Sequence, residues 1–192
     1  MMANILDIDM EAMRVSLKHA KGAVVLFDFR AAFPSISHKY LITVLTRMGL
    51  PESALNAVRL LYDGNTCRIS CKGSEYDGFE SSAGVRQGCP LSPLLFVAVV
   101  DVLLRRLELS TPRAMVRAFA DDIAMVLEEV FQHAGGLQEV FNEFAQISGL
   151  ELNLPKTLLI PLWEDSAESV ASELAAATPQ WKGISVKSSG TY

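Results

Sequence analysis

Apolar and polar positions along the chain follow two periods, one typical of helices and one typical of strands. Spacings of three and four residues, together with capping residues, predict helices over 7–20, 37–49, 51–64, 91–108, 135–149 and 164–177, of which 91–108 is expected to be mostly buried. Short β-branched or alternating runs predict strands over 23–29, 114–120, 123–129 and 157–163, and a hairpin formed by 66–73 and 75–84. Helices and hairpins mix without a regular β-α alternation, so the pattern favours an α+β fold over a doubly wound sheet.

Residues with special backbone or capping behaviour fix several of these boundaries. Ser37 is the expected N-cap of one helix, and Gly49 and Gly149 are expected to end two others. The helix over 7–20 would carry Asp and Glu in its first turn, where their negative charges interact favourably with the helix dipole and stabilise the helix.

Composition makes the chain an ordinary globular protein. It has 192 residues, of which 50% are apolar and 20% charged, enough for one substantial domain. Three cysteines suit neither a disulfide framework nor a zinc site. The longest apolar run, 93–104, is too short to cross a bilayer, and the N-terminus lacks the pattern of a signal peptide. We therefore expect an intracellular protein, in nucleus or cytoplasm, without a membrane partner.

The charge is distributed unevenly along the chain. The net charge of −5 argues mildly against a nucleic-acid partner. However, Lys and Arg outnumber Asp and Glu by 14 to 11 up to Ala118, whereas from Phe119 onward they are outnumbered by 11 to 3. The first part could therefore still face phosphates, and the acidic remainder is expected to be a solvated outer surface.

The stretch 117–126, RAFADDIAMV, places Asp121 and Asp122 inside an otherwise apolar run. A hairpin turn between two short strands would explain the pair, because Asp is common in turns. Asp28 lies at the end of the strand predicted over 23–29. A helix cap, or a position at the sheet edge where the strand meets solvent, would explain a carboxylate there. Alternatively, the three carboxylates could converge, and their repulsion would then require divalent cations.

Oxygen ligands without Cys or His select hard ions, Mg²⁺ first and Mn²⁺ second. Two such ions, about 3.5–4 Å apart, stabilise the attacking and leaving oxygens of a phosphoryl transfer. Adjacent strand residues point to opposite faces of a sheet. We therefore expect Asp121 to be the principal ligand and Asp122 a looser one.

A glycine- and proline-rich turn lies between the two groups of carboxylates. In SSAGVRQGCPLSPLLF (81–96), Gly84 and Gly88 make the backbone permissive, and the prolines open a helix. A helix N-terminus can seat a phosphate, and Arg86 and Gln87 would project from this turn. A plain helix start would explain the same residues.

Four stretches in this order resemble the motifs of reverse transcriptases, most closely the non-LTR (LINE-type) retrotransposon branch and its group II intron relatives. LFDFRAAFPSISH is similar to the first palm motif and GVRQGCPLSPLLF to the second. FADD is similar to the third, the catalytic aspartate hairpin, and GLELNLPKT to the fourth. The match spans about residues 22–162 and implies a polymerase palm with a central antiparallel sheet packed on helices.

The resemblance implies a role for individual residues. Asp28 and Asp121 would ligate the metal ions, with Asp122 beside them and the backbone carbonyl of Phe29 as a further ligand. Phe33 would lie under the nucleotide sugar. Gln87 and Gly88 would line the nucleotide pocket and Arg86 would flank it, while Lys156 would lie near the leaving pyrophosphate. The reaction would be attack of a DNA or RNA primer 3′-hydroxyl on a dNTP, templated by RNA.

The chain also departs from the family pattern. Only 27 residues precede Asp28, so we expect these 192 residues to lack the family's first fingers hairpin, and we expect them to lack its thumb as well. We therefore expect an N-terminal helix over 1–21 and a partial palm and fingers domain over 22–192, which works with missing fingers and thumb segments or within a longer polyprotein. Two alternatives remain: an inactive retrotransposon relic or domesticated nucleic-acid-binding fragment, and a different palm enzyme such as a nucleotide cyclase, which leaves RQGCPLSP unexplained.

Overall fold

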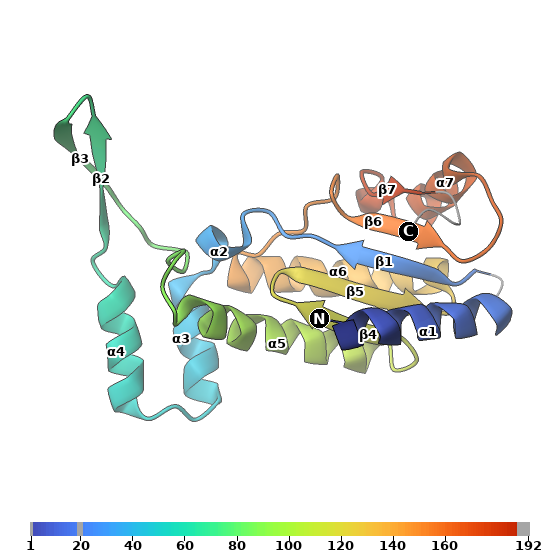
Figure 1. Cartoon of the computed structure of the whole chain (residues 1–192), viewed down its shortest axis with the longest axis horizontal. Helices are drawn as coiled ribbons and strands as arrows, with labels where there is room; N and C mark the ends of the chain where they lie inside the picture. The colour runs from blue at the N-terminus through green and yellow to red at the C-terminus, as the bar shows by residue number, and fades with distance from the viewer. Residues whose placement is uncertain (1, 19–20, 188–192) are drawn as a thin grey trace.

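A five-stranded sheet forms the centre of the protein in the computed structural model, which describes residues 2–18 and 21–187 (Figure 1). The strand order is β4-β5-β1-β6-β7, and every neighbouring pair is antiparallel except β6 with β7. The strands are β1 (Ala23–Phe27), β4 (Met115–Phe119), β5 (Asp122–Leu127), β6 (Leu158–Pro161) and β7 (Ser185–Val186). The central strand β1 consists of apolar residues only, as expected for a strand whose two faces are both covered.

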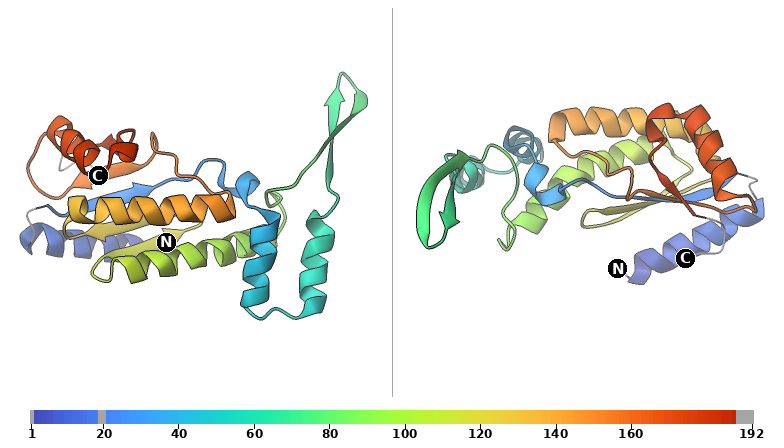
Figure 2. Two further views of the ribbon diagram at one scale, coloured as in Figure 1. Left: turned by 180° about the vertical axis from the view of Figure 1, so that it is seen from behind. Right: turned by 90° about the horizontal axis from the view of Figure 1, so that it is seen from above.

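Helices cover both faces of this sheet. The long helices α5 (Ser92–Ser110) and α6 (Val130–Ser148) lie on one face, and α1 (Met2–Lys18) lies on the other (Figure 2). Alternation along β1 explains how both faces become buried. Val25 and Phe27 belong to the main core with α5 and α6, whereas Val24 packs with Ala12 and Val15 of α1.

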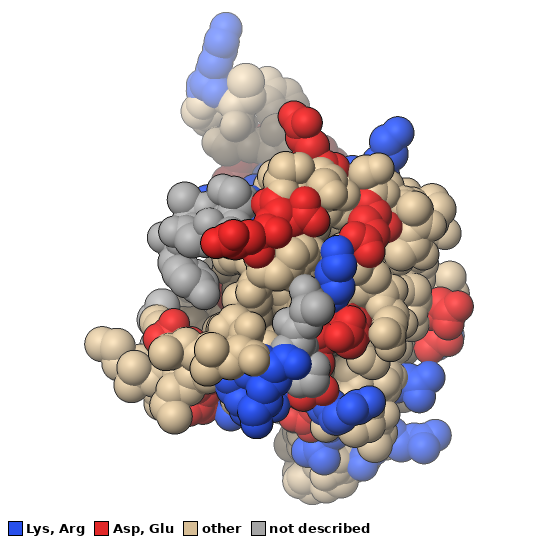
Figure 3. All heavy atoms as spheres, turned by 90° about the vertical axis from the view of Figure 1, so that its right-hand side faces the viewer, with Lys and Arg blue, Asp and Glu red and all other residues tan. Residues whose placement is uncertain are grey.

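The last part of the chain closes the far edge of the sheet. Helix α7 (Ala167–Ala177) and the 3₁₀ turn η1 (Pro179–Trp181) lead into β7, and Trp181 is buried against Phe27. Ser166 caps α7, since its hydroxyl accepts a hydrogen bond from the Ser169 amide at 3.1 Å. Acidic and basic side chains both lie on the surface at this end of the molecule (Figure 3).

A second region extends from the sheet between β1 and α5. It contains α2 (Ala32–Ser35), α3 (His38–Arg47), α4 (Glu52–Tyr62), and a separate hairpin of β2 (Thr66–Cys71) and β3 (Ser74–Glu80). This hairpin projects from the body of the protein, and every residue of its two strands is exposed (Figure 1). No helix in the described part of the chain is long and apolar enough to cross a membrane.

The α+β fold with a largely antiparallel sheet packed on helices is confirmed, and most boundaries differ from the predicted ones by a few residues. Ser37 caps α3 as predicted, and Gly149 ends α6 with a φ of 81°. The sequence did not reveal α2, η1 or β7, whose short segments carry too little periodicity.

Two helix starts were predicted too late. Helix α1 begins at Met2 rather than residue 7, so its first turn carries no acidic residue; the predicted positions 19–20 lie outside the described residues. Helix α6 begins at Val130 rather than residue 135 and continues through Gly135 and Gly136. Each glycine costs a helix roughly 1 kcal/mol, but the complete burial of Val130 and Ala134 outweighs that local preference.

Candidate active site

Asp121 and Asp122 lie at the turn between β4 and β5, which we call the aspartate hairpin (Phe119–Asp122). Phe119 pairs with Asp122, which leaves a two-residue loop of Ala120 and Asp121. Two-residue loops match the twist of a β-hairpin when φ is positive, and Ala120 has a φ of 55°. The predicted strand boundary was one residue off, because Asp122 is the first residue of β5.

Asp28 follows β1 directly and lies at the same end of the sheet. The register pairs Phe27 of β1 with Ile123 of β5, so its continuation brings Asp28 opposite Asp122. The Asp28 amide lies 3.5 Å from the hydroxyl of Thr157, and one of its carboxylate oxygens, Oδ2, is buried without a hydrogen-bond partner. A buried carboxylate oxygen without a partner is costly, and a cation is one way to satisfy it.

The charges of the three aspartates influence one another. Burial, followed by repulsion from Asp121 and then Asp28, raises the pKa of the Asp122 carboxyl above its usual range. Asp122 is nevertheless an exposed residue. A bound cation would offset the repulsion from Asp121 and Asp28, and so would lower the pKa of Asp122 again.

The chemistry of this donor set fits a hard divalent cation. Asp28 offers a buried oxygen without a partner, and the hairpin adds two carboxylates whose repulsion a cation would offset. With the side chains as placed, no three His, Cys, Asp or Glu groups among the described residues are close enough together to hold an ion. Apo side chains at such sites commonly rearrange when the ligand binds.

The backbone around Phe29 leaves its carbonyl oriented toward the aspartate hairpin. Phe29 forms an isolated antiparallel bridge with Leu152, flanked by hydrogen bonds from the Arg30 amide to the Glu151 carbonyl and from the Asn153 amide to the Asp28 carbonyl, both at 2.8 Å. In such a pair the central residue's own N–H and C=O point away from its partner. They therefore point to the side of β1 on which β5 lies.

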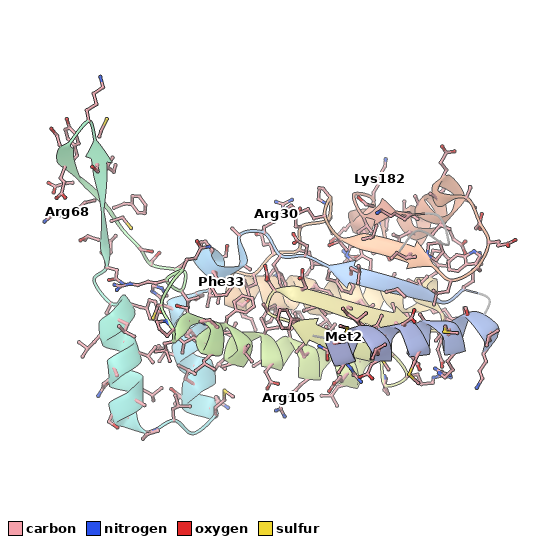
Figure 4. The ribbon with its side chains drawn as sticks, viewed as in Figure 1. Met2, Arg30, Phe33, Arg68, Arg105 and Lys182 are labelled. Atoms are coloured by element: carbon pink, nitrogen blue, oxygen red, sulfur yellow. The ribbon has the colours of Figure 1, made fainter. Side chains whose placement is uncertain are left out.

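Four of the residues predicted to hold the nucleotide meet in one pocket beside the start of α5. Phe33, Arg86, Gln87 and Gly88 line a cavity of about 420 Å³ together with Cys89, Pro90, Ser92 and Pro93. The Phe33 ring stacks on Phe96 of α5, with ring centroids 4.7 Å apart and planes inclined by 11° (Figure 4). This stacking holds the ring in place in the wall of the pocket.

Two glycines shape the loop that carries this pocket. Gly84 has a φ of 94°, and a Cβ there would lie 2.7 Å from the Pro34 carbonyl oxygen, so the loop approaches α2 as closely as a glycine allows. Gly88 has a φ of 87° with open space around it, which makes its backbone freedom the requirement. The first glycine ties the loop to the segment after Asp28, and the second turns the chain toward α5.

Some residues at this site were not foreseen. Asn65, which directly precedes β2, accepts a hydrogen bond from the Arg86 guanidinium, and no local pattern predicts a contact between these positions. Hydrogen bonds to sulfur from the backbone at Leu91 lower the pKa of the Cys89 thiol. These backbone groups open α5, whose first residues have no side-chain cap, which is consistent with the predicted anion seat at this turn.

Lys156 lies apart from the pocket that the other predicted residues share. It is exposed in a turn, and its amide donates to the Asn153 carbonyl at 3.0 Å. The next residue, Thr157, is buried and places its hydroxyl near the Asp28 amide. The turn that carries Lys156 is therefore joined to Asp28 through Thr157. It lies on the β6 side of β1, whereas the aspartate hairpin lies on the β5 side.

The arrangement joins an aspartate hairpin, a facing strand-end aspartate and a loop-helix pocket, in the order of the sequence motifs. The model of the reverse transcriptase (RNA-dependent DNA polymerase) family matches residues 2–173. The chain belongs to the reverse transcriptase family. This reverse transcriptase domain includes α1, since the match begins at Met2.

Relatives confirm the resemblance to the non-LTR branch. The Retrovirus-related Pol polyprotein from type-2 retrotransposable element R2DM of Drosophila melanogaster is 32% identical over 168 residues, which cover 82% of this chain and 15% of that protein. A Pol polyprotein from the type-1 retrotransposable element R2 of Popillia japonica is 35% identical over 147 residues, covering 71% of this chain and 20% of that protein. The reverse transcriptase domain thus spans a fifth or less of these relatives' length.

Solved structures support the fold. Telomerase from Candida tropicalis, in complex with a fragment of telomeric RNA, superposes with a TM-score of 0.66 at 15% sequence identity. The matched region covers 83% of this chain and 29% of the telomerase chain. At this identity the likeness concerns the fold alone, a mostly antiparallel sheet packed on helices.

Proposed function

We propose that this domain is the RNA-directed DNA polymerase core of a longer retrotransposon polypeptide. The observation that carries the proposal is the placement of Asp28 opposite the aspartate hairpin, at the same end of the sheet from which the chain continues to Phe33 and its pocket. Membership in the reverse transcriptase family and the R2 relatives support the same reaction. The domain would transfer a nucleotide from a dNTP to a primer 3′-hydroxyl.

Asp28, Asp121, Asp122 and the carbonyl of Phe29 are the proposed ligands of Mg²⁺, with Mn²⁺ as a possible substitute. The bound cations would supply charge neutralisation at the attacking and leaving oxygens. The protein itself contributes the alignment: β1 and β5 are buried and paired in register, so their ends hold the carboxylates at a fixed spacing. Asp121, in the loop, is the proposed principal ligand.

Phe33, Arg86, Gln87 and Gly88 are the proposed nucleotide-binding residues. A ring stacked on Phe96 is a rigid surface, and in this pocket it would lie under the nucleotide sugar and exclude a 2′-hydroxyl. Gln87 and the Gly88 backbone would line the pocket, and Arg86, exposed and oriented by Asn65, would flank it. Lys156 is proposed to neutralise charge on the leaving pyrophosphate.

The proposed partners are an RNA template, a DNA or RNA primer, and dNTPs. Phosphate contacts dominate nucleic-acid affinity, and the net charge of −5 makes the domain a weak binder by itself. We therefore propose that this chain is part of a larger intracellular enzyme, in nucleus or cytoplasm, whose other segments hold the duplex. Residues 1–21 would be its N-terminal helix, and residues 22–192 its palm and part of its fingers.

Primer extension on an RNA template tests this function. The comparison is between the wild-type chain, Asp121→Asn, and Asp101→Asn as a control that changes an exposed ion pair with Arg105 on α5. Removing a principal metal ligand should lower extension by about 10²-fold or more, because several kcal/mol of charge stabilisation are lost. Asp101→Asn should retain wild-type extension.

Equal extension by wild type and Asp121→Asn would disprove the metal-ligand assignment. The same assay in the full-length polypeptide that contains this domain distinguishes a polymerase core from an inactive relic. Binding of RNA without any magnesium-dependent extension there would support the relic.

A further inference from the structure

We propose that Asp7 of α1 holds the guanidinium of Arg117 away from Asp122, and so keeps the carboxylates of the aspartate hairpin available to a divalent cation. This inference rests on the proposed function. It concerns Asp7 and Arg117, which both lie outside the four sequence motifs, on the face of the sheet that α1 covers.

Arg117 and Asp122 lie on the same face of the β4–β5 hairpin. Arg117 pairs with Ala124, and Phe119 pairs with Asp122. Directly opposed residues share a face, and residues two apart along a strand share it as well. Arg117 and Asp122 are therefore diagonal neighbours, at a backbone spacing of roughly 7–8 Å that an arginine side chain can span.

Both residues line one groove beneath the first two turns of α1. The groove has a volume of about 300 Å³, and its described lining contains one basic and one acidic side chain, those of Arg117 and Asp122. The other walls are largely apolar, including Ile5, Ile8 and Leu26. Apolar walls strengthen the attraction between opposite charges, so a free Arg117 would be drawn to Asp122.

Asp7 prevents this by binding the guanidinium from the helix. Nε and one terminal nitrogen of Arg117 donate to Asp7 Oδ2 at 3.1 and 3.0 Å, and the other terminal nitrogen donates to the Val116 carbonyl at 2.9 Å. All three nitrogens of the guanidinium are thus engaged. The helix is itself fixed to the same strand, because the Asn4 side-chain amide donates to the Ala118 carbonyl at 3.1 Å.

The competition between Asp7 and Asp122 for Arg117 has a consequence for metal binding. An arginine paired with Asp122 would place a positive charge where a cation has to bind and would occupy one of its ligands. The Asp7–Arg117 pair is about 40% exposed, at 45% for the aspartate and 36% for the arginine, so its effect should be moderate. Asp7 and Arg117 are positioning residues, since neither is proposed to touch the substrate.

Titration of Mn²⁺, followed by its electron paramagnetic resonance signal, tests the proposal with a readout separate from polymerase activity. Asp7→Ala should weaken Mn²⁺ binding by about fivefold, and Asp7→Asn by less, because an amide oxygen still accepts from Arg117. Arg117→Gln should leave the affinity unchanged or slightly higher. The double variant with Asp7→Ala and Arg117→Gln should return to the affinity of Arg117→Gln.

Equal weakening by Asp7→Ala and Arg117→Gln, with no recovery in the double variant, would mean that the ion pair acts only as a brace for the hairpin and would overturn the proposal. Asp101→Asn serves as the matched control, and thermal unfolding checks that each variant folds. Alanine is a strong helix former, so Asp7→Ala preserves α1.

A second measurement separates this proposal from the proposed function. The side-chain N–H signals of Arg117, observed by nuclear magnetic resonance without metal, should respond to Asp122→Asn in the Asp7→Ala background and not in the wild-type background. This result would stand even if the wild-type chain bound no Mn²⁺, in which case the polymerase assignment alone would fail. No response in the Asp7→Ala background would overturn the proposal.

Discussion

Two β-hairpins in this domain have nearly the same local design and very different surroundings. In the aspartate hairpin, Phe119 pairs with Asp122 across a two-residue loop that begins with Ala120 at a φ of 55°. In the β2–β3 hairpin, Cys71 pairs with Ser74 across a two-residue loop that begins with Lys72 at a φ of 50°. The first lies in a sheet covered on both faces by helices, and the second projects from the body of the protein (Figure 1).

The comparison shows that the turn sets the shape of a hairpin and its surroundings set its rigidity. Met125 of β5 is fully buried, whereas Ile69 of β2 and Tyr76 of β3 are more than half exposed. An isolated two-stranded hairpin is at best marginally stable in water. A site that must hold several carboxylates at fixed spacing therefore belongs in the first hairpin and not in the second.

Truncating a core residue should produce the largest difference between the two hairpins. Met125→Ala removes a completely buried side chain and should lower the free energy of unfolding by about 2–5 kcal/mol. Ile69→Ala, at 51% exposure, should change it by about 0.5 kcal/mol or less. Denaturant unfolding measures both values, and a loss of several kcal/mol for Ile69→Ala would show that β2–β3 packs against the body.

A substitution inside the projecting hairpin should break it alone. A Cβ at Gly78 would lie 1.8 Å from the Cys67 carbonyl oxygen, so Gly78→Ala must shift the β2–β3 pairing. Amide exchange across β2 and β3 should accelerate by about tenfold or more, while exchange in β1 and β5 stays unchanged. Gly73→Ala at the turn is the comparison: its Cβ meets open space, so it adds only the strain of a left-handed alanine at a φ of 81° and should accelerate exchange less than Gly78→Ala. Faster exchange in β1 would contradict the separation of the two regions.

Relaxing the positive φ in each loop should stabilise only the packed hairpin measurably. Ala120→Gly removes the strain of a left-handed alanine and should raise the free energy of unfolding by about 0.5–1 kcal/mol, after the entropy of the unfolded chain is counted. Lys72→Gly relieves similar strain in a hairpin that opens independently, so global unfolding should change less. Thermal unfolding of both variants decides, and equal gains would refute the distinction.

The smallest expected effect concerns the charge of Asp122. Its pKa is raised in the folded protein, so the ionised carboxyl destabilises the fold as pH rises through that pKa. Asp122→Asn should therefore raise the free energy of unfolding at neutral pH by about 0.5 kcal/mol, since water screens this exposed group. The gain should vanish below pH 3.8, the usual pKa of the carboxyl, where both side chains are neutral. A gain independent of pH would mean that packing, not charge, is responsible.

The sequence by itself determined most of the segments that form strands and helices and the residues proposed for the site, though not the short elements α2, η1 and β7. The apolar runs around Asp28 and Asp121 predicted the two strands that meet in the structure, and Gly88 and the following prolines predicted the start of α5. These features are local, because the period of apolar positions and the freedom of a glycine act over a few residues. The family motifs then assigned the pocket around Phe33, which the structure assembles.

Only the tertiary structure decided how distant segments meet. The two glycines inside α6 are tolerated because the helix buries Val130 and Ala134, and no local pattern reports that burial. Asp7 and Arg117 are 110 residues apart in the sequence, and periodicity relates only residues a few positions apart. Their ion pair could therefore not be predicted from the sequence. The reason is physical: burial and ion pairing depend on which surfaces the folded chain brings together, and these surfaces exist only once the sheet has formed.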